Sequence, residues 1–231
     1  MRKNSVLHCC ERNGAVEKMS QKPLQQYFRK SMFLPPPKKN SLYTAAARVY
    51  NKQKEGESMT NETLNVIKSR RSSRAYKTDP VPEELLDAVL EAGTYAPSGM
   101  NKQSPTIVAV TSDKYRREIS ALNAAVMGVT SDPYYGAPVV VLVLADSNVG
   151  TWVEDGSCVL ENMMLAAESL GLATVWVHRE REIFDSERGK QLLREWGLPE
   201  TLRGVGSIAL GYAAAPAKPA APRKAGYIVK V

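Results

Sequence analysis

An apolar run of nine residues, Ala137–Ala145, constrains the fold of this chain more than any other feature. Its centre, Val139–Leu144, contains only valine and leucine, a composition typical of a strand that is buried on both faces. The run is far shorter than the roughly 20 apolar residues that a membrane-spanning helix needs, and no other stretch approaches that length. Hydrophobic residues make up 43% of the 231-residue chain, which is enough for the packed core of one domain, with or without an appendage.

Helix and strand patterns follow one another from Met59 to the C-terminus. Pro82, Glu83 and Glu84 open one helix, because proline and acidic residues suit the free amides and the dipole of a first turn. Gly93 is its expected terminator, and Gly171 is expected to end the longest helix. The expected helices are 62–69, 81–93, 114–126, 153–170 and 182–195, with a turn at 133–136, and the expected strands are 106–111, 139–144, 173–177 and 205–210, with a strand-like pattern at 227–231.

The positive charge of the chain is concentrated at its beginning. The formal net charge is +7 at pH 7, yet residues 1–58 carry 12 basic and 4 acidic residues, whereas residues 59–231 carry 19 basic and 20 acidic residues. The body is therefore close to neutral, and nucleic-acid binding is disfavoured. Because the basic segment contains Pro35–Pro37 and no sustained hydrophobic period, we expect residues 1–58 to form a disordered extension and residues 59–231 to form the folded domain.

Three interpretations are open for the basic segment. It is a disordered tail, or an organelle-targeting presequence, which Glu11 and Glu17 disfavour, or the result of a start site placed too early. We favour a start at Met59, because Lys54-Glu55-Gly56 can be encoded by AAG GAG GGN, a purine run like a bacterial ribosome-binding site, two codons before Met59. The N-terminal mass of the native protein tests this hypothesis, and a polypeptide that begins at Met1 contradicts it.

Cysteine and histidine are too few to indicate a metal or disulfide framework. The chain has three cysteines, of which Cys9 and Cys10 are adjacent, and its histidines are His8 and His178. We therefore expect no metal site and a reducing, cytoplasmic location. The sequence contains neither G-x-G-x-x-G nor G-x-x-x-x-G-K-[ST], which disfavours a Rossmann dinucleotide domain and a P-loop.

A cluster of arginines and serines, Arg70-Arg71-Ser72-Ser73-Arg74, is the first candidate for ligand binding. In an extended segment Arg70, Ser72 and Arg74 lie on one side, since side chains alternate. Guanidinium groups match the geometry of a phosphate, and hydroxyls add directional donors. The alternative is a solvated basic stretch at the end of a helix, where cations are favoured in any case.

A turn-rich loop, Ala96–Pro105, is the second candidate. Pro97 and Gly99 favour a turn, while Ser98 and Asn101 offer polar groups to the backbone or to the edge of a flat heterocycle. The loop follows the arginine cluster by about 25 residues, with one helix between them. A phosphorylated aromatic cofactor fits this pair of segments.

The chain from about Met59 to its C-terminus resembles the nitroreductase family of flavin enzymes. The family pattern is R-x-S-x-[RK], a helix, and then A-P-S-x-x-N-x-Q-P, from which this chain departs by inserting Ser104 before Pro105. Further matching segments are Glu161–Leu172, Thr174–Arg179, Gly211-Tyr212 and Ala221–Lys224. The resemblance implies an α+β fold with a central, mostly antiparallel sheet flanked by helices. It also implies a homodimer with an exchanged C-terminal segment and FMN bound at the subunit interface.

The resemblance further implies roles for individual residues. The arginine cluster, including Arg71 and Ser73, belongs to the cofactor site, with Arg70, Ser72, Arg223 and Lys224 at the phosphate and ribityl chain. Arg74 is placed near the N1/O2 edge of the flavin, where a cation stabilises the charge of the reduced ring. The ring is bordered by a loop of the partner subunit, namely Pro97, Ser98, Gly99 and Asn101. Backbone amides approach N5 and O4 from Trp176, Val177, His178 and Arg179.

Two of these assignments have alternatives in the residues themselves. Trp176 and Val177 suit the core of a buried strand as well as a cofactor site. His178 suits a general acid by its residue type, but the resemblance gives this position a backbone role, so we assign no catalytic side chain.

The implied activity is FMN-dependent reduction of a small acceptor, such as a nitroaromatic, a quinone or an enone, by NADH or NADPH with ping-pong kinetics. The flavin supplies the difficult chemistry, so no catalytic triad is needed. The alternatives are another flavin reaction on the same fold (dehalogenation, dehydrogenation or flavin breakdown) and a flavin-binding protein without turnover. Neither nucleic acid nor a membrane is expected as a partner.

Overall fold

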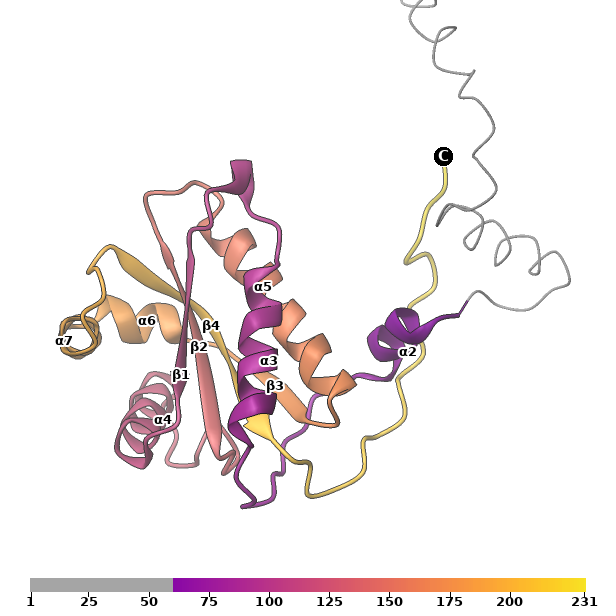
Figure 1. Ribbon diagram of the computed structural model, residues 1–231, viewed down its shortest axis with the longest axis horizontal. Coiled ribbons are helices and arrows are strands. Elements are labelled where there is room, and N and C mark those ends of the chain that lie inside the picture. Colours follow the sequence, from indigo (N-terminus) through magenta and orange to yellow (C-terminus); the bar gives the residue numbers. More distant parts are fainter. Residues whose placement is uncertain (1–59) are drawn as a thin grey trace, which may run out of the picture. The chain divides into compact units, whose positions relative to one another are not determined.

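The computed structural model describes residues 60–231, and Figure 1 traces them in colour. The expected disordered extension and the hypothesis of a start at Met59 both lie outside the described residues. Among residues 60–231, no helix is long and apolar enough to cross a membrane.

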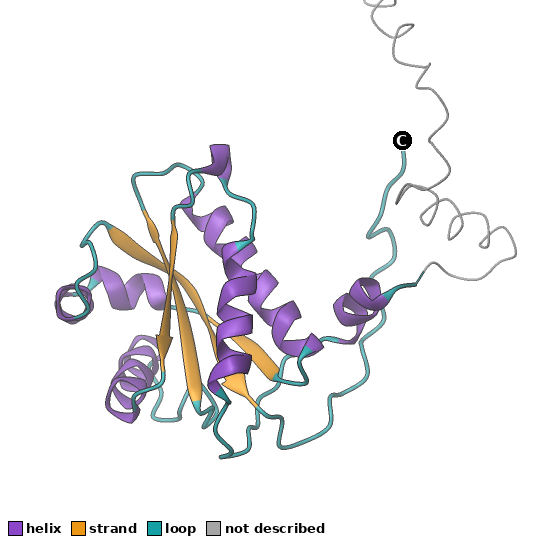
Figure 2. Ribbon diagram, in the orientation of Figure 1, coloured by secondary structure: helices purple, strands orange, loops and turns teal. Residues whose placement is uncertain are grey.

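Four antiparallel strands form the central sheet, in the order β1-β2-β4-β3 (Figure 2). The strands are β1 (Pro105–Val110), β2 (Val139–Asp146), β3 (Ala173–Val177) and β4 (Leu202–Gly211). In the register, Val108 pairs with Leu142 of β2, and Trp176 of β3 pairs with Ile208 of β4. The expected antiparallel sheet and its four strands are confirmed.

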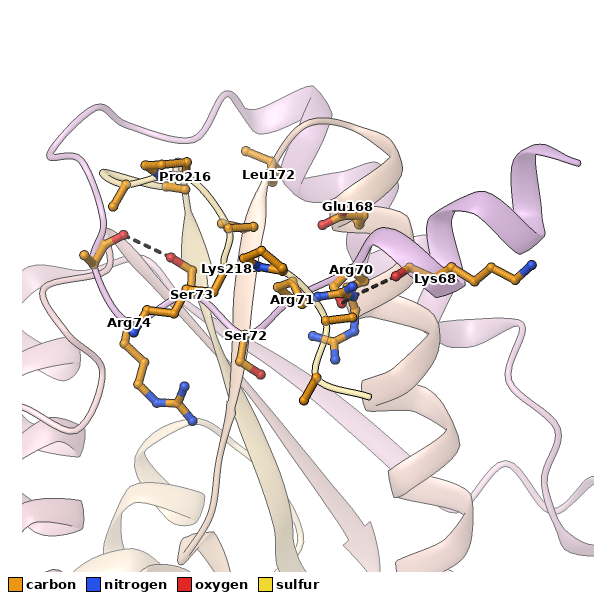
Figure 3. A pocket seen from close by; sticks show the side chains of 18 of the residues that line it. Lys68, Arg70, Arg71, Ser72, Ser73, Arg74, Glu168, Leu172, Pro216 and Lys218 are labelled. Atoms are coloured by element: carbon orange, nitrogen blue, oxygen red, sulfur yellow. Dashed lines mark hydrogen bonds between the residues drawn. The ribbon is translucent and has the colours of Figure 1, made fainter. Parts of the chain in front are cut away.

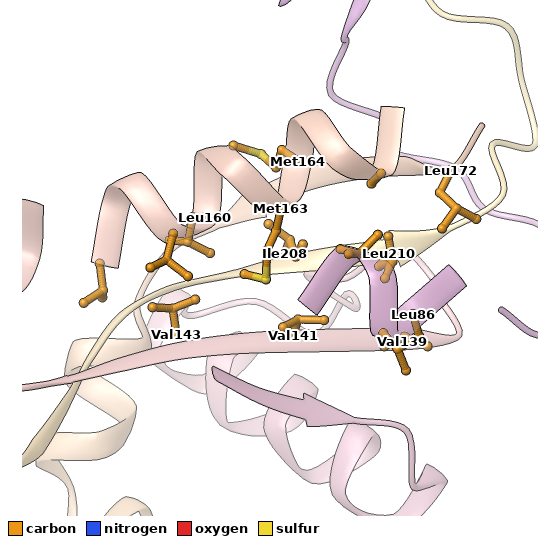
Figure 4. Packing of buried hydrophobic residues seen from close by; sticks show 14 of the residues in the cluster. Leu86, Val139, Val141, Val143, Leu160, Met163, Met164, Leu172, Ile208 and Leu210 are labelled. Atoms are coloured by element: carbon orange, nitrogen blue, oxygen red, sulfur yellow. The ribbon is translucent and has the colours of Figure 1, made fainter. Parts of the chain in front are cut away.

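Helices cover both faces of this sheet, as Figure 1 shows. One cluster of buried side chains joins α3 (Glu83–Thr94) and α5 (Trp152–Ser169) to Val141 and Val143 of β2, and Figure 4 shows part of it. A second cluster joins α4 (Asp113–Met127), α6 (Glu180–Asp185) and α7 (Glu187–Glu195) to Leu142 and Leu144. Successive residues of β2 therefore face opposite helix layers, and the predicted burial on both faces is confirmed.

Three local expectations are wrong. Residues 182–195 form two helices, because Ser186 has extended backbone and its Oγ caps α7 by accepting a hydrogen bond from the Gly189 amide at 3.1 Å. Gly93 lies inside α3, where a Cβ atom would come within 2.8 Å of the Met163 side chain, so its role is close packing against α5. Residues 227–231 form no strand within the described protomer and are exposed.

Two peripheral segments extend beyond the layered body. Helix α2 (Glu62–Ser69) buries no side chain. Asn61 caps its first turn, because the Asn61 side chain accepts a hydrogen bond from the Leu64 amide. After β4 the chain forms one bridge, between Tyr76 and Ala213, and continues as an exposed arm over residues 213–231. Figure 1 shows α2 and the arm on the same side of the sheet.

Candidate functional site

A cavity of about 1120 Å³ lies where three segments meet: the end of α2 with the arginine cluster, the end of α5, and the arm. Figure 3 shows its lining. The arginine cluster is held against the edge of β3, since Ser72 forms a parallel bridge with Thr174 and the Ser73 amide donates to the Thr174 carbonyl at 2.9 Å. The cavity lining includes the whole predicted cluster, Arg70 to Arg74.

Arg70 and Arg71 are partly buried, and both line this cavity. The Arg71 Nη1 atom donates to the carbonyls of Lys68 and Ser69 at the end of α2 and to that of Arg70, at 2.7 to 3.1 Å. Within residues 60–231, Arg70 Nη1 and Arg71 Nε are buried and have no hydrogen-bond partner. Because these two atoms have no accessible surface, they do not face the cavity. The stronger indication is that Arg70, Arg71, Arg74 and Arg223 all line it, a donor set suited to an anion.

The side chains of the cluster alternate as an extended segment requires. Ser73 Oγ donates to the Ala75 carbonyl at 3.0 Å. In Figure 3 the Ser72 hydroxyl and the Arg74 guanidinium point to the opposite side from Ser73. Ser72 and Arg74 are both exposed, so their polar groups are available to a ligand.

The two cations of the C-terminal arm differ in position. Arg223 lines the cavity and donates from Nε and Nη2 to the Ala221 carbonyl at 3.2 and 2.8 Å. Lys224 does not line the cavity, and its Nζ lies 5.2 Å from the centroid of the Tyr227 ring. Lys218 of the arm, which the sequence did not single out, does line it.

The second candidate loop lies at the other end of α5. The Gly99 amide donates to Asp155 Oδ1 at 2.9 Å, in the first turn of α5, whereas Glu168, in the last turn of α5, lines the cavity. Thirteen residues of helix separate these two positions, a rise of about 20 Å. The structure therefore does not bring Pro97, Ser98, Gly99 and Asn101 to the arginine cluster of the same chain.

The segment from Trp176 to Arg179 starts in β3 and ends in a strained turn. The Val177 side chain is buried in the second core cluster, and Trp176 packs against the first, as a core interpretation of these side chains predicts. His178 is exposed. Arg179 has φ +91° and ψ 7°, a left-handed conformation that is costly for residues other than glycine.

A buried polar cluster beside this turn was missed by the sequence analysis. It consists of Asn123, Tyr134, Glu180 and Ser207. Burial raises the pKa of the Glu180 carboxyl to about 7, against the opposing effect of hydrogen bonds from Ser207 and Tyr134. Burial and the neighbouring Glu180 also raise the pKa of Tyr134 well above its ordinary value. No signal in a single sequence identifies Glu180, since it stands in a run of charged residues, 179–182, that is typical of a solvated helix.

Comparison with known proteins identifies the family. The model of the nitroreductase family matches residues 67–141 and 125–212. The chain belongs to the nitroreductase family. Among the residues that the structure describes, no group of three or more His, Cys, Asp or Glu side chains is arranged to hold a metal ion.

Nitroreductase relatives cover most of this chain. A protein from Methanothermobacter thermautotrophicus with the provisional name NADH dehydrogenase/NAD(P)H nitroreductase is 32% identical over 165 residues, which are 69% of this chain and 82% of that protein. A nitroreductase with bound FMN from Bacteroides fragilis is 35% identical, with a TM-score of 0.69, and the match covers 74% of this chain and 100% of that one. A second FMN-bound nitroreductase, from Desulfitobacterium hafniense, is 31% identical, with a TM-score of 0.68 and coverage of 75% and 100%.

Proposed function

We propose that this nitroreductase-family protein binds FMN and uses NADH or NADPH to reduce a small organic acceptor. The observation that carries the proposal is a single cavity lined by four arginines, Arg70, Arg71, Arg74 and Arg223, together with Ser72. Structural relatives with FMN bound support the choice of ligand. Residues 59–231 are the proposed FMN-binding domain, and the fit of residues 67–212 to the family supports this boundary.

The hydrogen-bond donors that line the cavity match the phosphate end of FMN. Arg70, Arg71, Ser72 and Arg223 offer guanidinium and hydroxyl groups to a phosphate and its ribityl chain. Ser73 lies in the same backbone segment, although its hydroxyl is already bonded to the Ala75 carbonyl. Lys224, which follows Arg223 directly, is proposed to join them when the ligand is bound.

The ring is proposed to lie along β3, from the arginine cluster toward the His178–Arg179 turn. Ala173, at the start of β3, lines the cavity, and Val177 ends the strand about 13 Å further on, at 3.3 Å per residue. Arg74 is the proposed cation at the N1/O2 edge, where it stabilises negative charge. FMN, when bound, accepts a hydride from the nicotinamide and passes electrons to the acceptor.

A homodimer is part of the proposal, because one protomer cannot complete the site. The loop with Pro97, Ser98, Gly99 and Asn101 contacts the first turn of α5, whereas the arginine cluster lies at its last turn, about 20 Å of helix away. We therefore assign this loop to a second copy. The exposed arm is the proposed exchanged segment, since Ile228 and Val229 are 79% and 78% exposed. The proposed location is the cytoplasm, because the three cysteines form no disulfide pattern.

Free flavin is a second candidate acceptor. A relative from Bacillus subtilis, named FMN reductase [NAD(P)H], is 28% identical over 189 residues. Another from Vibrio harveyi, named NADPH-flavin oxidoreductase, is 28% identical over 163 residues. These names favour adding free FMN and riboflavin to nitroaromatics, quinones and enones in an acceptor panel.

The test begins with the visible spectrum of the purified protein and its anaerobic reduction by NADH and by NADPH, followed by the acceptor panel. Bleaching of a yellow protein is the expected result, and a flavin that no pyridine nucleotide reduces indicates a storage protein. A colourless protein that FMN cannot reconstitute contradicts the proposal.

Arginine variants test the placement of the phosphate. Arg70→Ala together with Arg223→Ala is expected to abolish stoichiometric FMN binding while circular dichroism stays unchanged. Arg117→Ala is the matched control, because Arg117 is exposed on α4 and does not line the cavity. Stoichiometric FMN in the double variant contradicts the assignment of the phosphate grip.

A further inference from the structure

The carboxyl group of Glu180 joins four parts of the fold at one buried point. Glu180 is the first residue of α6 and is 0% exposed. Its Oε1 atom accepts hydrogen bonds from Ser207 Oγ of β4 at 2.6 Å, from the Tyr134 hydroxyl at 2.9 Å and from Asn123 Nδ2 of α4 at 3.3 Å. Within the described residues its Oε2 atom is buried without a partner. A carboxyl group is costly to bury, so this arrangement calls for a reason beyond packing.

Asn123 connects the carboxyl group to the turn after β3. Its Nδ2 atom donates to the His178 carbonyl at 2.8 Å as well as to Glu180, and its Oδ1 atom lies 3.5 Å from Arg179 Nη1. Nδ2 carries two hydrogens: one serves the His178 carbonyl, and the other is shared between Glu180 Oε1 and the Tyr134 oxygen, each at 3.3 Å. The polar cluster therefore contacts the backbone of the turn directly.

The turn needs such support. Arg179 holds φ +91° although it is not glycine, and a strained residue persists only where its surroundings determine its conformation. The backbone of Glu180 packs directly against Gly204 of β4. A Cβ atom on Gly204 would lie 2.1 Å from the Glu180 carbonyl carbon, so only glycine fits there.

We propose that Glu180 is a positioning residue that, through Asn123, fixes the His178–Arg179 backbone against the edge of the bound flavin ring. This inference rests on the proposed function, which places that turn beside the ring. The ionisable groups that face the Glu180 carboxyl are Tyr134, within the cluster, and Arg179, which contacts it through Asn123. Glu180 itself does not touch the cofactor; it acts through the turn.

Hydrogen exchange on the full-length protein, with and without added FMN, tests the first half of the inference. Asn123→Ala and Glu180→Leu are expected to speed amide exchange over residues 178–183 by about tenfold, because the hold on the turn is lost. Glu180→Gln retains an oxygen acceptor and is expected to restore most of the protection. Asn162→Ala is the matched control, since Asn162 Nδ2 also donates to a backbone carbonyl, that of Ala92, away from the turn. Unchanged exchange in Asn123→Ala overturns the proposal, and this variant decides the matter if Glu180→Leu does not fold.

FMN titration of the same variants tests the second half. Asn123→Ala is expected to weaken FMN binding by about tenfold and to alter the visible circular dichroism of the bound flavin. Faster exchange with unchanged FMN affinity and an unchanged flavin spectrum means that the cluster is structural only and overturns the positioning role. If the wild-type protein binds no FMN at all, both the proposed function and the positioning role are contradicted. The exchange result still decides whether the polar cluster holds the turn.

Discussion

The Glu180 carboxyl group makes stability depend on pH in a direction opposite to that of most acidic residues. Burial raises its pKa to about 7 in the folded protein from an ordinary value of 4.5. Between these two values the folded state keeps a proton that the unfolded chain has released, so the free energy of unfolding falls as pH rises. The accumulated loss by pH 7 is about 3 kcal/mol, and Glu180→Gln is expected to remove it.

Urea unfolding at pH 5, 6, 7 and 8 measures this effect in both proteins. The difference between wild type and Glu180→Gln is the informative quantity, because other titrating groups cancel. Asp132, for example, has a lowered pKa because it accepts hydrogen bonds from Ser120 and from backbone amides. The pKa of Asp185 is lowered by its hydrogen bond with Arg203. Parallel pH profiles for the two proteins would show that folding does not raise the pKa of Glu180, and would contradict this account.

At the scale of single residues, the sequence predicts cations better than it predicts buried acids. The cluster from Arg70 to Arg74 stands out because a body that is close to neutral surrounds it. Glu180 stands in the charged run 179–182, and only the fold places it under β4 while its neighbours Arg181 and Glu182 are exposed. Burial of one charge within such a run depends on tertiary contacts that a single sequence does not contain.

The packing of α6 against β4 depends on a glycine. A Cβ atom at Gly204 would meet the Glu180 carbonyl carbon at 2.1 Å and its oxygen at 2.2 Å, and both are backbone atoms that cannot rotate away. Gly204→Ala is therefore expected to lower stability by at least about 2 kcal/mol in thermal or urea unfolding. Gly150→Ala is the control, because no atom lies within 4 Å of a Cβ there, and equal stabilities of the two variants would contradict this account.

The loop before β1 is fastened to α5 by one buried carboxylate. Asp155 accepts hydrogen bonds from the Gly99 amide at 2.9 Å, from Ser104 Oγ at 2.9 Å and from Thr151 Oγ1 at 3.1 Å. Ser104, the departure from the family pattern, thus has a structural role. Asp155→Ala leaves these donors without their acceptor and is expected to cost about 3 kcal/mol.

Limited trypsin digestion checks the same variant locally. Cleavage after the exposed Lys102 is expected to accelerate in Asp155→Ala, because the loop is released. Asp113→Ala serves as the comparison, since that carboxylate is exposed and pairs only with Arg116. Equal cleavage rates in the two variants would argue against Asp155 as the anchor of the loop.

At the scale of elements, the sequence predicts strands and most helices but not where helices break. The hydrophobic pattern and the residues that begin and end helices are local signals. They predict α2, β3 and the burial of β2 directly. The break at Ser186 was missed because the residues on both sides favour helix, and the cap bond to the Gly189 amide is a small local term. The order β1-β2-β4-β3 depends on long-range pairing, which no local pattern contains.

At the scale of the whole molecule, the core of the described residues lies inside the part that matches the family. Within residues 60–231, the buried members of both core clusters lie between Leu86 and Leu210, and the side chains packed against them extend from Tyr76 to Tyr212. The family match spans residues 67–212. A chain that begins at Met59 is therefore expected to fold, to bind FMN with unchanged affinity and to unfold at the same temperature within about 2 °C, since about 1 kcal/mol corresponds to 2–4 °C at this size. Scanning calorimetry and FMN titration measure both quantities, and loss of either would assign a structural role to residues 1–58.

Two features of the described chain fit the proposed homodimer. Helix α2 buries no side chain, although a helix of eight residues is unstable without packing, and the arm exposes Ile228 and Val229. Both observations are accounted for if a second copy covers these segments and supplies its loop 97–101 to the site. Sedimentation at micromolar concentration is then expected to give a dimer.

Charge placed on the arm separates this explanation from a free tail. Ile228→Asp with Val229→Asp is expected to weaken the dimer by at least about a hundredfold, because two carboxylates would replace apolar contacts. FMN affinity should fall with it, since the proposed site takes the arginines and the loop from different copies. Lys230→Asp changes the charge of an equally exposed neighbour and is expected to leave both quantities near wild type. A double variant that stays dimeric with unchanged FMN affinity would place the arm outside the interface, and the site would then have to be completed within one chain despite the length of α5 between its halves.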